Sequence, residues 1–137
     1  MLVCAALPCL AGCETKPPHA GMPTIQAQSM QVMLADVERV RAYVYGGGDT
    51  TRGDAVTAAT DLVSWSRRMG ELFPPGQAST DYVDMDQARV RSAPEAMTSA
   101  AERLLAVVRT GNRAAIGDQL RATERDGCGF CHLNGTQ

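Results

Sequence analysis

Residues 116–132 read IGDQLRATERDGCGFCH, and this stretch decides how the chain folds. Its apolar and small residues recur every three or four positions, at Ile116, Leu120, Thr123, Gly127 and Cys131. This spacing is typical of an amphipathic helix that packs one face against neighbouring helices. Cys128, Cys131 and His132 project from the same side, because residues three and four apart share a helix face. A group bound by these three side chains would therefore enter the core.

Three further stretches show the same helical spacing, and none alternates with the period of a strand. Their apolar stripes are Met30, Met33, Val37, Val40 and Val44; Ala55, Ala59, Leu62, Ser66, Met69 and Phe73; and Met97, Ala101, Leu104 and Val108. Glycine or proline follows each stripe, as expected where a helix ends. The sequence thus predicts an all-α fold, an antiparallel four-helix bundle with the CxxCH motif near the C-terminus of the last helix.

Helix ends and connections can also be read from the chain. Asp54 is expected to cap the second helix, Ser92 and Pro94 lie near the start of the third, and Asn112 is near the start of the fourth. The first and third connections are short, which favours antiparallel neighbours. The middle connection, residues 74–91, is long enough to be a crossover or a partly helical excursion.

Composition excludes some classes of protein. The 137 residues carry 15 acidic and 13 basic side chains, so the basic surplus of a nucleic-acid-binding protein is missing. Only 4% of the residues are aromatic, although 45% are hydrophobic. A core built from Ala, Val, Leu and Met lacks the large rings that usually fill a domain centre. We expect another group to occupy that space.

The N-terminal cysteines indicate export. Residues 1–12 are an uncharged apolar run too short to span a bilayer but suited to a signal peptide. Leu10-Ala11-Gly12-Cys13 resembles a bacterial lipobox, which implies cleavage before Cys13 and diacylation of its thiol. Residues 13–24 are then the lipidated cysteine and a flexible tether, and 25–137 are the folded domain. A buried N-terminal helix is the structural alternative.

Cys128-Gly129-Phe130-Cys131-His132 has the spacing of c-type haem attachment. Each thiol adds to one haem vinyl group, and the adjacent imidazole reaches the iron. A zinc site would need about four ligands, and the chain offers only His19 and surface carboxylates to complete it. A redox dithiol usually lies at a helix N-terminus rather than near a helix end. Haem c is therefore the expected cofactor.

A four-helix domain with CxxCH on its last helix resembles cytochrome c′ and its Met/His-ligated relatives, the class II c-type cytochromes. The resemblance covers roughly residues 24–132. It implies that Cys128 and Cys131 hold one covalent haem and that His132 is the proximal iron ligand. Laying residues 26–33 on the family's first helix puts Met30 at the distal position, with Met33 as second choice. An open sixth position remains the alternative.

The chain departs from the family pattern at the haem propionates. Gln26 stands where the family has an arginine that meets a propionate, and no arginine or lysine follows His132. Arg121 and Arg125, on the haem-bearing helix, are the available substitutes, although a place on the solvated face of the helix better explains each of them. Gln26 could donate a neutral hydrogen bond. Met69 and Met97 are interpreted as core residues, while Met22 and His19 fall in the tether.

The resemblance implies an electron carrier. The sequence offers no nucleophile with a base and no paired carboxylates beside the haem motif, so we do not expect an enzyme. We expect a periplasmic protein tethered to a bacterial membrane through Cys13, with redox proteins as partners. Family members often pair through their first two helices, so a homodimer is possible. The alternatives are a five-coordinate cytochrome c′ that binds nitric oxide or carbon monoxide, and a helical module without haem.

Overall fold

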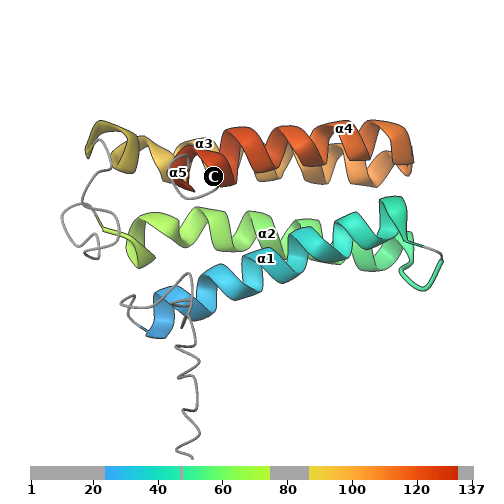
Figure 1. Cartoon of the computed structure of the whole chain (residues 1–137), viewed down its shortest axis with the longest axis horizontal. Coiled ribbons are helices and arrows are strands. Elements are labelled where there is room, and N and C mark those ends of the chain that lie inside the picture. The colour runs from blue at the N-terminus through green and yellow to red at the C-terminus, as the bar shows by residue number, and fades with distance from the viewer. Residues whose placement is uncertain (1–23, 47, 75–86, 133–137) are drawn as a thin grey trace, which may run out of the picture.

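The computed structural model describes residues 24–46, 48–74 and 87–132, apart from the side chains of 24, 87–90, 131 and 132. The main helices are α1 (Thr24–Tyr45), α2 (Arg52–Leu72), α3 (Gln87–Thr110) and α4 (Arg113–Thr123). The last helix continues through the π-helical turn η2 (Glu124–Cys128) into α5 (Gly129–His132). No residue in the described ranges lies in a strand. The predicted all-α four-helix bundle is confirmed (Figure 1).

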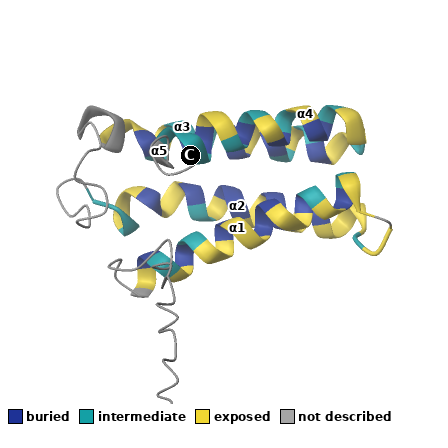
Figure 2. Cartoon of the chain, in the orientation of Figure 1, coloured by how far each residue is buried: buried dark blue, intermediate teal, exposed yellow. Residues whose placement is uncertain are grey.

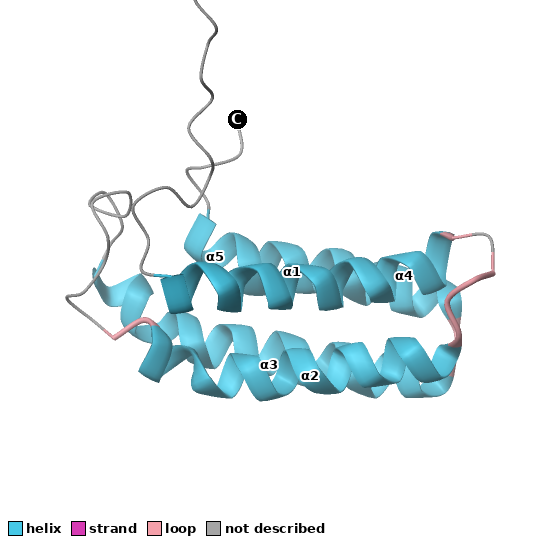
Figure 3. Cartoon of the chain, turned by 90° about the horizontal axis from the view of Figure 1, so that it is seen from below, coloured by secondary structure: helices cyan, strands magenta, loops and turns pink. Residues whose placement is uncertain are grey.

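The four helices form a closed ring. Each helix packs against the next one in the chain, and α1 also packs against α4. Consecutive helices run in opposite directions (Figure 1). The short first and third connections predicted this for α1 with α2 and for α3 with α4. Figure 3 shows α1 beside α4 and α2 beside α3. Because α3 packs directly on α2, the long middle connection joins neighbouring helices.

Side-chain caps explain where α2 and α4 begin. The N-cap of α2 is Thr51, so the expectation that Asp54 caps this helix is wrong by three positions. Asp54 instead completes a capping box: its amide donates to the Thr51 hydroxyl, and its carboxylate accepts from the Thr51 amide at 2.8 Å. Hydrogen bonds from the Thr51 hydroxyl and amide lower the pKa of Asp54. Asn112 caps α4 by accepting from the Ala115 amide.

Helix α3 begins at Gln87, several residues before the predicted start near Ser92 and Pro94. Pro94 therefore lies inside the helix, where proline is normally unfavourable because it has no N–H and its ring crowds the preceding turn. Gly70 of α2 faces this ring, and a Cβ added at Gly70 would lie 4.0 Å from the Pro94 Cγ. Pro94 of α3 thus lies beside α2, at ordinary packing distance from Gly70.

The core consists mainly of small and aliphatic side chains. Figure 2 shows the buried residues as stripes along the helices. The fully enclosed positions include Ala55, Ala58, Ala59, Leu62, Ala100, Ala101, Leu104, Val108 and Ile116. Tyr43 is the one buried aromatic residue in the described ranges. None of the described helices has the length and apolar character needed to cross a bilayer.

One carboxyl group is buried in α1. Asp36 is only 4% exposed, and its Oδ2 has no hydrogen-bond partner in the described part of the chain. Burial raises the pKa of Asp36 to about 6, with a further contribution from the Asp61 charge and an opposing one from Arg39. A proton therefore binds to Asp36 more tightly in the folded protein than in the unfolded chain.

Candidate functional site

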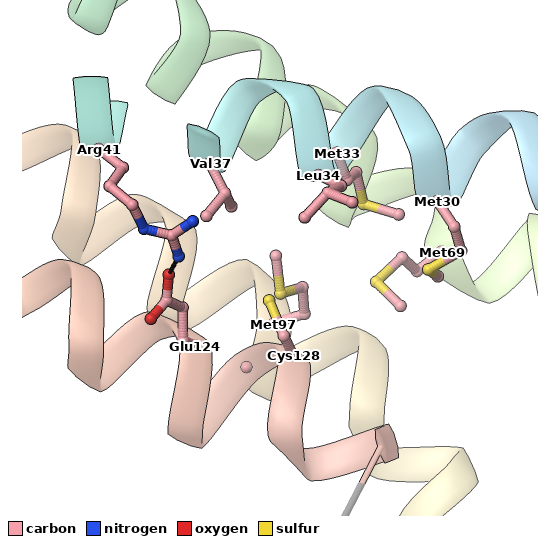
Figure 4. Close-up of a pocket in the computed structure, with 10 residues that line it drawn as sticks. Met30, Met33, Leu34, Val37, Arg41, Met69, Met97, Glu124 and Cys128 are labelled. Carbon is pink, nitrogen blue, oxygen red and sulfur yellow. Dashed lines mark hydrogen bonds and ion pairs between the residues drawn. The ribbon is translucent and has the colours of Figure 1, made fainter. Parts of the chain in front are cut away.

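A cavity of about 270 Å³ opens between α1 and the C-terminal helical segment (Figure 4). Helix α1 provides half of its wall, and α2, α3 and η2 provide the rest. The lining residues are Met30, Met33, Leu34, Val37, Arg41, Met69, Met97, Glu124, Gly127 and Cys128. Leu34 is 57% exposed, so the cavity reaches the protein surface beside this residue. Apart from Arg41 and Glu124, the lining side chains are apolar or small.

The cavity exists because η2 lies close to α3 and away from α1. Among the described elements, η2 packs on α3, α4 and α5, whereas α1 packs on α2 and α4. Gly127 permits the close approach to α3: a Cβ added there would lie 2.8 Å from Met97 Sδ and 3.2 Å from Ala100 Cβ. The buried Thr123 hydroxyl donates to the Ala100 carbonyl at 3.3 Å and to the Gln119 carbonyl at 2.9 Å. These contacts hold the segment against α3 and leave the space next to α1 open.

The CxxCH motif begins at Cys128, the last residue of the π-helical turn η2, and continues into α5. The Gly129 amide donates to the Glu124 carbonyl five residues earlier, the hydrogen bond that defines a π-helix. The expectation of one regular α-helix up to the motif is therefore wrong at residues 124–128, where the backbone forms the wider π turn. Such single π turns are frequent at functional sites.

Of the predicted haem-binding residues Cys128, Cys131 and His132, the first lies at the cavity. Cys128 is partly buried and lines it. Cys131 and His132 follow in α5, at the end of the described chain, and their side chains lie outside the description. The tertiary structure thus brings the first motif residue to the wall that faces α1. The predicted lipidation site, Cys13, is outside the described residues.

Methionines from three helices surround the space in front of Cys128 (Figure 4). Both predicted distal candidates are among them: Met30 is partly buried, and Met33 is only 5% exposed. Met69 and Met97 are buried, as predicted for core residues, and they also line the cavity, which the sequence did not reveal. Helical spacing identified the buried faces of α2 and α3. Which residues of these two helices lie beside Cys128 depends on how the helices pack against each other.

The three predicted propionate partners are engaged elsewhere. The Gln26 amide donates to the Leu72 carbonyl at 2.6 Å and so joins the start of α1 to the end of α2. Arg121 forms an ion pair with Asp118 and donates to the Tyr45 hydroxyl, and Arg125 pairs with the adjacent Asp126. None of these three residues is in the cavity wall.

Two charged residues of the cavity wall were missed in the sequence. Arg41 of α1 forms an ion pair with Glu124 of η2, and it also pairs with Glu38 one turn earlier in its own helix. The side-chain hydrogen bond to Glu38 is the largest cause of the raised pKa of Arg41, and the charge of Glu124 adds to it. Arg41 follows Val37 by four residues, so a signal was present in the helical spacing. Its partner Glu124 is 83 residues away in the sequence.

The wall fits an apolar macrocycle that carries charged groups at one edge. Thioether and aliphatic groups cover most of the surface, the Cys128 thiol is within reach, and the charged pair occupies one end (Figure 4). In the described part of the chain, no three His, Cys, Asp or Glu residues are grouped so as to hold a metal ion. The apolar wall and its charged end fit the predicted haem, and Cys128, a predicted attachment residue, lines the same cavity.

Comparison with known protein families gave a match over most of the chain. The profile of the family described as Cytochrome C' matches residues 24–134, which include all the described helices and the CxxCH motif. No curated protein and no solved structure matches the chain.

Proposed function

The chain belongs to the cytochrome c′ family and is thus a haem-binding c-type cytochrome, and from this premise we propose that it carries single electrons. Members of this family bind haem c covalently. In our proposal, Cys128 and Cys131 attach one haem, His132 is the proximal ligand and Met30 is the distal ligand. Membership in this family disfavours the alternative of a helical module without haem.

The observation that carries the electron-transfer proposal is the position of two methionines on the α1 wall. Met30 and Met33 line the same cavity as Cys128. A thioether is a soft, neutral ligand, which favours ferrous iron and raises the reduction potential. An iron with six ligands in both oxidation states changes its geometry little when an electron moves. Met30 remains the first candidate and Met33 the second.

The chain's own groups would perform distinct tasks at this site. Bound haem supplies the iron that takes up and releases the electron. The apolar side chains Val37, Met69 and Met97 would exclude water from the bound group. The thiols of Cys128 and Cys131 would hold it covalently. The exposed Leu34 at the cavity wall would give a partner protein access to the site.

Absorption spectra of the haem-loaded protein test the function. We expect a low-spin ferric spectrum with the weak long-wavelength band of methionine ligation. Met30→Ala should abolish this band and allow carbon monoxide to bind the ferrous form, because the sixth position is then open. Met33→Ala is the matched control and should keep the band.

Other spectra would favour other functions. A high-spin ferric spectrum and ready carbon monoxide binding in the unsubstituted protein would support the five-coordinate gas-binding alternative. If Met33→Ala, and not Met30→Ala, opens the iron, then Met33 is the ligand. A protein that stays colourless when produced with the haem attachment machinery would contradict both cytochrome functions.

We also propose that Cys13 carries a lipid anchor and that the domain lies in the periplasm. Support comes from the Leu10-Ala11-Gly12-Cys13 sequence and the polar stretch that follows it. Cys13→Ser should move the protein from the membrane fraction to the soluble fraction, as measured by fractionation and immunoblot. Cys9→Ser is the matched control, since Cys9 is predicted to lie in the removed signal peptide. Unchanged membrane association of Cys13→Ser would argue against lipidation.

Redox proteins remain the proposed partners, and a homodimer remains a prediction. Helix α1 bears the large exposed apolar residues of the described chain, Ile25, Val32, Leu34 and Tyr45. Exposed apolar residues on one helix offer surface for such contacts.

A further inference from the structure

Two opposite charges lie at one end of the otherwise apolar cavity. Arg41 and Glu124 are the charged residues of its described wall, and they form an ion pair across the gap between α1 and η2. Their side chains are 37% and 34% exposed, so the pair lies at the rim, half-buried. Figure 4 shows it on the side of the cavity away from Met30 and Met69.

The guanidinium of Arg41 can serve more than one carboxylate. Arginine has five N–H donors in a planar fork, and it pairs well with carboxylates. Here it contacts two of them, Glu38 and Glu124. Glu38 is one turn away on the same helix, so this pair does not depend on the other side of the cavity. Glu124 is on η2, four residues before Cys128, where a bound haem would lie.

A haem in this cavity brings two propionates, which need water or a cation as partners. The predicted partners Gln26, Arg121 and Arg125 are bonded to other groups outside the cavity wall. Arg41 is the cationic residue in the described wall. Because Arg41 lies at the rim, a propionate paired with it would stay near solvent while the macrocycle occupies the apolar part of the cavity.

Resting on the proposed function, we infer that Arg41 pairs with a haem propionate and that Glu124 competes for the same guanidinium. The two residues then tune the iron in opposite directions. A positive charge near the haem favours the ferrous form, which carries less positive charge, and so raises the reduction potential. The negative charge of Glu124 favours the ferric form and lowers it. Because the pair lies half-buried at the rim, solvent screens both effects in part.

The midpoint potentials of haem-loaded variants test this inference. We expect Arg41→Gln to shift the ferrous-to-ferric equilibrium toward the ferric form by about three- to tenfold, where tenfold corresponds to about 59 mV for one electron. Glu124→Gln should shift it toward the ferrous form. Arg41→Lys should shift the midpoint potential less than Arg41→Gln does, because lysine keeps the positive charge but lacks the planar fork. Arg121→Gln is the matched control and should change the equilibrium less than twofold, because Arg121 is outside the cavity wall.

A purely structural ion pair would behave differently. Arg41→Gln and Glu124→Gln would then lower the thermal midpoint alike and leave the potential at its wild-type value, which would overturn the inference. A rise in potential on Arg41→Gln would overturn it as well. If Arg41→Gln does not fold, a wild-type potential in both Arg41→Lys and Glu124→Gln would overturn the inference instead. Failure of the proposed function can be told apart from failure of this inference, because it shows in the absorption spectrum of the unsubstituted protein. If that protein contains no haem, both the proposed function and this inference are overturned.

Discussion

Replacing both Cys128 and Cys131 by alanine should yield a protein without covalently bound haem. Each thiol is expected to form one thioether with a haem vinyl group, so either single variant should keep one bond and the double variant none. Acid–acetone extraction followed by a pyridine haemochrome spectrum measures the covalent fraction. We expect complete extraction from the double variant and none from the unsubstituted protein.

The same variant should be less stable, because the cavity loses its occupant. An apolar cavity costs about 24 cal/mol per Å³, so a dry cavity of 270 Å³ would cost roughly 6 kcal/mol. This value is an upper limit, because the cavity opens to solvent beside Leu34. Cys9→Ala is the control and should retain both covalent haem and stability. Haem that resists extraction from the double variant would rule out attachment through these cysteines.

Gly127→Leu should lower the unfolding free energy by about 3 kcal/mol, at the upper end of the usual cost of overpacking. A Cβ at this position already lies 2.8 Å from Met97 Sδ and 3.2 Å from Ala100 Cβ. Met97 is buried and lines the cavity that the haem is expected to fill, and Ala100 has no flexible side chain that could give way. The substitution would push η2 away from α3 and displace Cys128. Urea unfolding of the haem-loaded protein gives the free energy.

Gly53→Leu is the matched control for this substitution. A Cβ at Gly53 of α2 would meet only the Thr51 hydroxyl at 3.5 Å, which is ordinary contact. Gly53 is exposed, so the same change should alter stability by no more than about 0.5 kcal/mol. Equal losses at Gly127 and Gly53 would show that close packing on α3 does not constrain η2.

The difference between predicted and observed helix ends has local and tertiary causes. Asn112 was recognised as the start of α4 because a cap is a contact between residues three apart. The same local reasoning chose Asp54 rather than Thr51, since both residues of a capping box have cap-forming side chains. The early start of α3 was not predicted, because proline is normally unfavourable inside a helix and Pro94 was therefore placed near the first turn.

The sequence by itself determined the number of helices, their buried faces and the position of the CxxCH motif on the last helix. These features depend on spacing within one helix or on neighbouring residues, which the chain order fixes. It also placed Met30 and Met33 one turn apart on α1. The expected shortage of aromatic residues in the core is visible in the structure, where Tyr43 is the one buried ring among the described residues.

Only the tertiary structure decided what surrounds the motif. It placed Met69 and Met97 around the cavity, directed Gln26 to the Leu72 carbonyl, and paired Arg41 with Glu124. Periodicity shows which face of a helix is buried, but it does not show which residue of another helix lies at the same level. That level is set by the packing of η2 on α3 through Gly127, a contact between segments far apart in the chain.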